Sequence, residues 1–346
     1  MRMNALRFGL LLAASTALVP FGASAMAEDN PWVQQDPQFF SARSLSLDEL
    51  IANTVVAVNP QAAGITVRLE GKTDRLALVR VHQDGASVIV EMDGHGEGDW
   101  IEEWLDWSFE DTDESTRDLK VWVEVPDGAA IAASEYIGDI EVGSTNGPFA
   151  LSGIGSIDAV IGNVSSASIE VAGGGDVQIL SVSGATSIAI AGSGDVTIGS
   201  SHATSISVAG SGDVALGKVE GGLEVEIAGS GECVVDSLNG AVSVSIAGSG
   251  DVRIRDGRAD PVEVSVAGSG SFLFNGEAVN PEISVVGSGD IWFASYSGQL
   301  SADGADIRIG GTPDDDLTEP ARAPRAPSAP PAPPAPPAPV PPVSPN

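Results

Sequence analysis

The chain has 346 residues and carries 48 Asp and Glu against 16 Lys and Arg, a formal charge of −32. This charge disfavours electrostatic binding to DNA, RNA or an anionic membrane, because their phosphates repel an acidic surface. Glycine and proline are abundant and aromatic residues make up 5%, which favours short strands with tight turns over helices. The single cysteine, Cys233, rules out an intrachain disulfide framework and a cysteine-based zinc site.

Residues 1–27 are typical of a secretory signal peptide. Two arginines precede an apolar run from Phe8 to Val19, and small residues follow it around Ala25 and Ala27. The run is shorter than the roughly 20 residues that a transmembrane helix needs, and no later stretch is apolar enough to span a bilayer. We therefore expect an exported protein of the periplasm or the cell surface without a transmembrane segment. Residues 28–44 form an N-terminal segment that precedes the predicted fold.

Residues 93–118 form an acidic, tryptophan-rich insertion. Trp100, Trp104 and Trp107 recur at i, i+4 and i+7, which predicts a short amphipathic helix between two strands. One interpretation is a lid whose tryptophans pack on the body of the protein. The other is an exposed patch that binds a partner or a sugar ring, because exposed aromatic clusters often mark contact sites.

A glycine motif recurs through the centre of the chain as AGGGD, AGSGD or a close variant. Its copies are 19, 18, 19, 19, 20 and 19 residues apart. Their last residues are Asp176, Asp195, Asp213, Glu232, Asp251, Ser271 and Asp290. Apolar residues alternate on both sides of each copy, as Ile206, Val208, Val214 and Leu216 do, in phase with the two glycines. This pattern predicts two strands per unit with a bend at the glycines.

A unit with one apolar row cannot bury that row alone, so the units must stack about 4.8 Å apart around a shared core. We therefore predict an all-β fold: a single parallel β-solenoid over residues 45–311 with turns of about 19 residues. Glycine suits the bend either because a Cβ would clash in the corner or because φ is positive there. An antiparallel sandwich or propeller is the alternative, but a propeller blade needs about 40 residues. The handedness and the number of sides stay open.

Residues 312–346 contain 14 of the 22 prolines, mostly in Ala-Pro alternation. Proline fixes φ and lacks an N–H donor, so this tail cannot join a sheet or a helix. We expect a disordered, extended spacer, with a proline-motif ligand as the alternative.

The GSGD turns, together with the alternating segments 64–69 and 119–126, resemble the putative auto-transporter adhesin, head GIN domain family. The resemblance covers about residues 45–311. It implies a secreted or surface β-solenoid whose biochemistry is not established, and it brings no catalytic residues with it.

The aspartates that end the glycine motifs are the candidate metal ligands. Asp176, Asp195, Asp213, Asp251 and Asp290 have outward parity and should stack in a column, where each neighbouring pair repels by about 1 kcal/mol in water. One interpretation is that each carboxylate accepts backbone N–H groups at its own glycine turn. The other is binding of divalent cations such as Ca²⁺, although one carboxylate per turn is few for an ion that takes roughly six to eight oxygens. No other cofactor is expected.

Motifs of catalysis are absent: there is no GxSxG, HExxH or Walker sequence. His82, His95 and His202 are far apart in the sequence, and Cys233 has the parity of a core residue. Carbohydrate-active β-helices group carboxylates with arginine, and the nearest counterpart in this sequence is Asp251 with Arg253 and Arg255.

Outward positions of the repeat are small and polar, which suits weak, repeated contacts rather than a deep pocket. Ser205, Ser207, Ser243 and Ser245 are examples. The favoured function is a non-enzymatic envelope or surface module with an acidic face, for binding, adhesion or structure. Its partner is unknown; a glycan and an envelope protein are the candidates. A carbohydrate-active β-helix enzyme and a cation-stabilised structural module are the alternatives.

Overall fold

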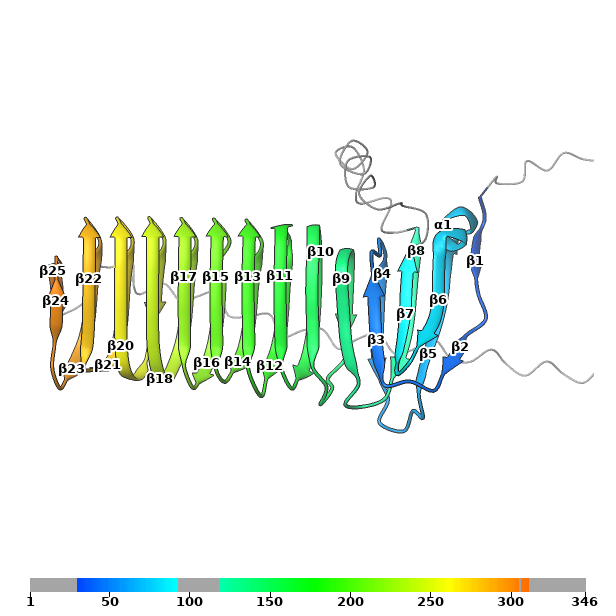
Figure 1. The fold of residues 1–346 in the computed structure, drawn as a ribbon, viewed down its shortest axis with the longest axis horizontal. Helices are drawn as coiled ribbons and strands as arrows, with labels where there is room; N and C mark the ends of the chain where they lie inside the picture. The colour runs from blue at the N-terminus through cyan, green and yellow to red at the C-terminus, as the bar shows by residue number, and fades with distance from the viewer. Residues whose placement is uncertain (1–29, 93–117, 305, 311–346) are drawn as a thin grey trace, which may run out of the picture.

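The computed structural model describes residues 30–92, 118–304 and 306–310. Strands in these ranges stack into a long coil (Figure 1). The coil is a parallel β-solenoid of about nine turns with a spacing of about 19 residues, which confirms the predicted fold class. The signal peptide, the tail and the tryptophan-rich insertion, apart from Asp118, lie outside the described residues.

Each turn contains a first leg before the glycine corner and a second leg after it. The first leg is formed by β11 (Ala167–Gly174), β13 (Thr186–Gly192), β15 (Thr204–Gly210), β17 (Leu223–Gly229), β22 (Pro281–Gly287) and β24 (Ser301–Asp303). The second leg is formed by β12 (Asp176–Val182), β14 (Asp195–Ser201), β16 (Val214–Glu220), β19 (Asp251–Ile254), β21 (Ser271–Val279), β23 (Asp290–Ser297) and β25 (Asp306–Ile309). Four longer strands contribute to both legs: β9 (Ala130–Val142), β10 (Phe149–Val164), β18 (Glu232–Gly248) and β20 (Gly257–Gly268).

Equivalent residues of successive turns lie directly above one another. Val208, for example, pairs with Ile190 below it and with Ile227 above it, and all three side chains are buried. Gly210 likewise pairs with Gly192 and Gly229, so the glycine corners form one column. The apolar residues that alternate in the sequence therefore form one continuous core along the axis of the coil.

The two glycines of a corner are required for different reasons. Gly210 has φ +142°, and a Cβ on it would lie 2.2 Å from the carbonyl oxygen of Gly192 one turn earlier. Gly212 has no such φ, but a Cβ there would lie 2.8 Å from Cγ2 of the buried Ile190. Positive φ and a clash, which the sequence offered as alternatives, thus both apply to Gly210, whereas the clash alone applies to Gly212.

The second leg bends once more. Val214, Leu216 and Val219 are all buried, and the spacing of three between the last two breaks the alternation. The chain then returns to the first leg through Gly221 and Gly222. This turn therefore has three corners, a number that the sequence left open.

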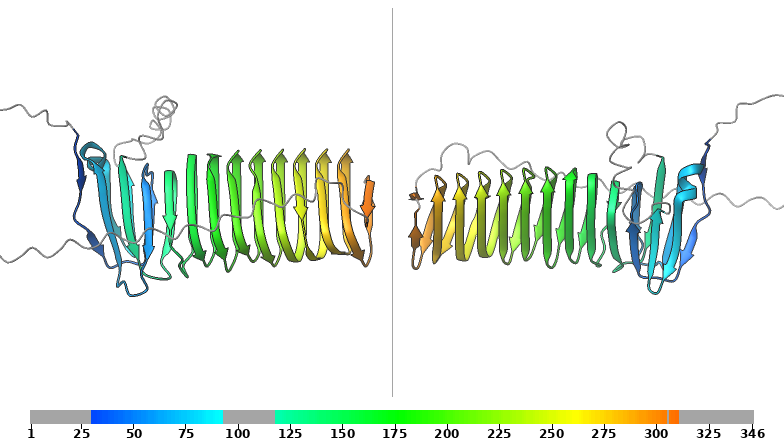
Figure 2. Two further views of the ribbon diagram at one scale, coloured as in Figure 1. Left: turned by 180° about the vertical axis from the view of Figure 1, so that it is seen from behind. Right: turned by 45° about the horizontal axis from the view of Figure 1, so that its top comes forward.

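Antiparallel strands close the N-terminal end of the coil (Figure 2). The two legs continue below β9 through β3 (Ser44–Asp48) and β4 (Asn53–Val58), then through β7 (Ser87–Met92) and β8 (Leu119–Val125), all in parallel. Antiparallel to these lie β6 (Val79–Asp84) on β7 and β5 (Ile65–Lys72) on β8, with β1 (Trp32–Gln34) and β2 (Gln38–Phe40) on β5. The helix α1 (Thr73–Leu78) joins β5 to β6 and buries Leu76. Core residues at this end, such as Leu45 and Val67, are fully covered.

Candidate functional site

The acidic residues of the glycine motifs form one column on the second leg, as the sequence predicted. Asp176 pairs with Asp195, and Glu232 pairs with Asp251. The column also continues toward the N-terminus through Asp158 and Asp139, which the sequence reasoning missed because their turns lack the GSG motif. The period of 18 or 19 residues upstream of Asp176 was the signal that could have located them.

The carboxylates accept backbone N–H groups from the following turn, whereas the sequence placed these bonds within the same turn. Four such bonds, of 2.9 to 3.2 Å, run from the N–H of Asp176 to Asp158, of Asp213 to Asp195, of Glu232 to Asp213 and of Ser271 to Asp251. The prediction of a same-turn bond is wrong because backbone N–H groups in a parallel coil point along its axis toward the neighbouring turn. The aspartates therefore link successive turns to one another.

Charge along this column is partly neutralised by arginine. Arg253 forms ion pairs with Glu232 and with Asp251, the latter with Nη2 and Oδ2 3.2 Å apart. In the middle of the column, burial and then the neighbouring Asp195 raise the pKa of the Asp213 carboxyl. The repulsion that the sequence predicted is thus present where no arginine intervenes.

The column does not gather a metal cluster within the described part of the chain. Nowhere in 30–92, 118–304 and 306–310 do three or more His, Cys, Asp or Glu side chains come together so that they could hold a metal ion. Each turn offers at most one acidic side chain to the column, and several of these already accept a backbone N–H. Such an arrangement provides hydrogen-bond acceptors along a line rather than a closed coordination sphere.

The residues considered for catalysis either lie far from one another or already form ion pairs. Arg253 is held by its two carboxylates, and Arg255 pairs with Asp236 at 2.9 Å. His82 lies in β6 at the N-terminal end and His202 at the corner after β14, while His95 lies outside the described residues. Burial raises the pKa of the Cys233 thiol to about 12, so this side chain is a core residue and not a thiolate nucleophile.

The outer side of the first leg carries two rows of short polar side chains, which we call the serine face. The first row is Ser168, Ser187, Ser205, Glu224, Ser243, Glu263, Glu282 and Ser301. The second row is Glu170, Ala189, Ser207, Glu226, Ser245, Ser265, Ser284 and Asp303. All are exposed except the half-buried Ala189. Except at Ala189, the face therefore presents two hydroxyl or carboxyl positions per turn, repeated about every 4.8 Å.

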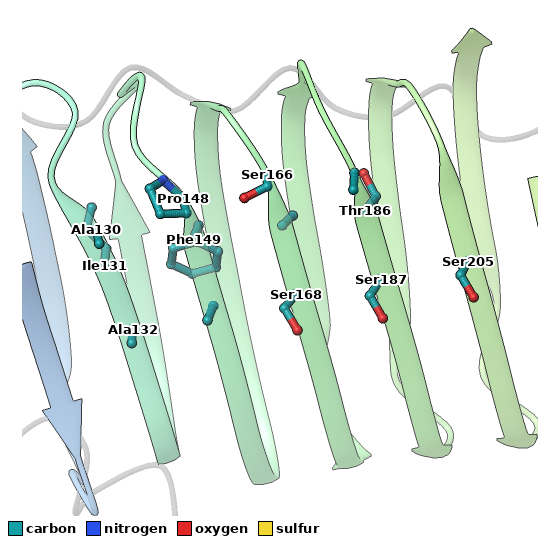
Figure 3. Close-up of a pocket in the computed structure, with 13 residues that line it drawn as sticks. Ala130, Ile131, Ala132, Pro148, Phe149, Ser166, Ser168, Thr186, Ser187 and Ser205 are labelled. Atoms are coloured by element: carbon teal, nitrogen blue, oxygen red, sulfur yellow. The ribbon is translucent and has the colours of Figure 1, made fainter. Parts of the chain in front are cut away.

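The serine face leads into a shallow groove at its N-terminal end (Figure 3). The groove has a volume of about 560 Å³ and is lined by residues of five successive turns. The first row continues there as Ala132 and Ala150, while Pro148 lines the corner beside it. The sequence did not reveal this groove, because it depends on small residues of several turns that only the stacking aligns.

Solved structures of low sequence identity resemble this chain. A putative adhesin from Bacteroides fragilis is 13% identical with a TM-score of 0.40, and the alignment covers 77% of this chain and 97% of that protein. A putative adhesin from Parabacteroides distasonis is 14% identical with a TM-score of 0.32, covering 81% and 98%. A putative lipid binding protein from the same species is 13% identical with a TM-score of 0.29, covering 82% and 96%.

No curated protein matches the sequence. Among protein families there is a match, and it lies in the C-terminal half of the coil. Residues 218–314 match the family described as putative auto-transporter adhesin, head GIN domain, and this match confirms the resemblance that the GSGD turns indicate.

Proposed function

We propose that this protein is a non-enzymatic, extracytoplasmic binding module of the adhesion type, and that it contacts its ligand through the serine face. The observation that carries the proposal is the in-register repetition of exposed hydroxyl and carboxyl groups over eight turns of the first leg. The adhesin-head family match and the signal peptide predicted at residues 1–27 support it. In the described residues no helix has the length and apolar character to cross a membrane.

The chemistry of the face favours a glycan as the ligand. Hydroxyl and carboxylate groups pair with sugar hydroxyls, and a polymer lying along the coil would meet the same groups at every turn. Each contact is weak, but contacts on one chain add up because later ones form at high effective concentration. The charge of −32 disfavours acidic polysaccharides, so the proposal is a neutral or amino-bearing glycan.

A glycan array probed with the chain from Glu28 to Asn346 tests the proposal. The discriminating variant is Ser187→Arg, which places a long cation in the first row beside the groove. Its matched control is Ser237→Arg on the second leg, where the neighbouring turn already carries Lys218. Binding that is lost in Ser187→Arg and kept in Ser237→Arg supports the serine face. Equal loss in both variants, or no glycan bound by the wild type, contradicts it.

Calcium binding by the acidic column is a separate hypothesis for Asp176, Asp195, Asp213, Asp251 and Asp290. Melting curves with and without millimolar Ca²⁺ test it, and the array is run under both conditions. A melting temperature that rises with Ca²⁺ would establish a cation-stabilised module. An unchanged value leaves the hydrogen bonds between turns as the role of these residues.

A further inference from the structure

The C-terminal end of the coil exposes its core. In the last turn but one, the inward residues Ile283, Ile291 and Phe293 are at most 2% exposed. Their counterparts one turn later are Ala302, Ile307 and Ile309. Ala302 is exposed, Ile307 is only partly buried and Ile309 is 44% exposed. Within the described residues, the apolar interior therefore ends on a surface that no further strand covers.

The strand edges at this end are also open. The last strands, β24 and β25, pair with β22 and β23 on one side, and no strand of the described residues pairs with their outer side. An edge of this kind presents backbone N–H and C=O groups to any strand that can reach it. The N-terminal end differs, because antiparallel strands and α1 close it and its core residues are covered.

The chain's own remaining segments are poor candidates for covering this end. Residues 312–346 carry 14 prolines, which lack the N–H groups of a further turn, and the acidic run Asp314 to Asp316 lies before most of them. Residues 93–117 leave from β7 and return to β8 at the opposite end, eleven strand pairings from β24. That distance is about 53 Å, whereas a loop of this length reaches out and back by about 44 Å at most.

We propose that a second copy of this chain covers the open end, so that two coils meet tail to tail about a two-fold axis. A two-fold axis that crosses this end perpendicular to the facing edge strands makes them antiparallel, the pairing with the better hydrogen-bond geometry. The closed N-terminal end prevents a head-to-tail series, so the assembly stops at two copies. Their two N-terminal ends point in opposite directions. The inference does not depend on the serine face.

The size of the interface sets the expected affinity. Each end surface measures about 24 Å, the rise of seven residues, by about 20 Å, which is the roughly 10 Å between two packed legs plus the outward side chains on both sides. Two copies therefore bury about 1,000 Å² in total, which is at the lower limit of specific interfaces. We expect a reversible dimer with a dissociation constant in the micromolar range.

Sedimentation equilibrium of the chain from Glu28 to Asn346 between about 1 and about 300 μM tests the proposal. The weight-average mass should rise from that of one copy toward that of two. Ile309→Asp places a charge on the open end and should raise the dissociation constant at least tenfold. Phe39→Asp is the control, because Phe39 is an exposed apolar residue of the opposite end, and it should leave the constant unchanged. Melting curves of both variants establish that they fold.

Chemical cross-linking provides a second readout. Because Cys233 is buried, a cysteine introduced by Arg308→Cys in β25 is the accessible thiol, and a short bismaleimide should join two copies. Val33→Cys in β1, at the closed end, should cross-link at least tenfold less. A monomer at every concentration overturns the proposal. So does a dimer that Phe39→Asp abolishes and Ile309→Asp retains, or a mass that grows beyond two copies.

Discussion

Replacing one glycine of the corner column by alanine should destabilise the coil strongly. In Gly210→Ala the new Cβ meets the carbonyl oxygen of Gly192 at 2.2 Å, and the residue must keep φ +142°. The obstructing atom belongs to the backbone of the neighbouring turn, so no side-chain rotation can relieve the contact. Two other glycines separate these effects: Gly85 has φ +57° with open space around it, and Gly222 has open space without a positive φ.

The three substitutions should form a graded series. Gly222→Ala removes freedom from the unfolded chain and should be neutral or stabilise by about 0.5 kcal/mol. Gly85→Ala adds the strain of a positive φ, about 1 to 2 kcal/mol. Gly210→Ala adds to that strain the cost of overpacking, about 1 to 3 kcal/mol, for a total of about 2 to 5 kcal/mol.

Urea unfolding followed by circular dichroism measures the series. The slope of each transition is compared among the variants, because a coil of stacked turns can lose cooperativity when one turn is weakened. If Gly210→Ala proves no more destabilising than Gly85→Ala, successive corners do not stack as closely as the structure shows. The argument from the glycine column would then fail.

Three further predictions concern single side chains. The raised pKa of Asp213 means that the native state binds its proton more tightly than the unfolded state, so its stabilising contribution is full at low pH and is lost as the pH rises through the native pKa. Asp213→Asn should therefore raise the free energy of unfolding at pH 7 by up to about 1 kcal/mol, and the gain should shrink at pH 3.5; a gain independent of pH would contradict this cause. The Cys233 thiol should react with a thiol reagent at pH 8 at least a thousandfold more slowly in the native protein than in urea, and fast native labelling would show that the core opens. Phe272→Ala, which removes a buried ring 5.8 Å from that of Phe293, should cost about 3 to 5 kcal/mol in chemical unfolding, and a cost below 1 kcal/mol would show that the core is loosely packed there.

Local pattern was sufficient for the fold class. Val208 and Val214 lie an even number of residues from the two glycines, and this alternation predicts which side chains point inward. The constant period indicates that each unit repeats the same geometry. A single apolar row with that period can be buried only by stacking, so the parallel coil follows from the residues alone. The outward position of the acidic column follows from the same parity.

Contacts between turns decided the rest. The partner of the Asp195 carboxylate is the N–H of Asp213 on the next turn, a choice that depends on the direction of backbone groups in the stacked coil. The groove beside Pro148 arises from residues of five turns at once. The closed N-terminal end and the open C-terminal end likewise depend on which strands meet there: β5 pairs with β8, whereas no described strand pairs with the outer side of β25. Within the repeat, the period predicts which residues lie next to one another on successive turns. At the ends of the coil the repeat stops, so only pairing between residues far apart in the sequence decides how the core is covered.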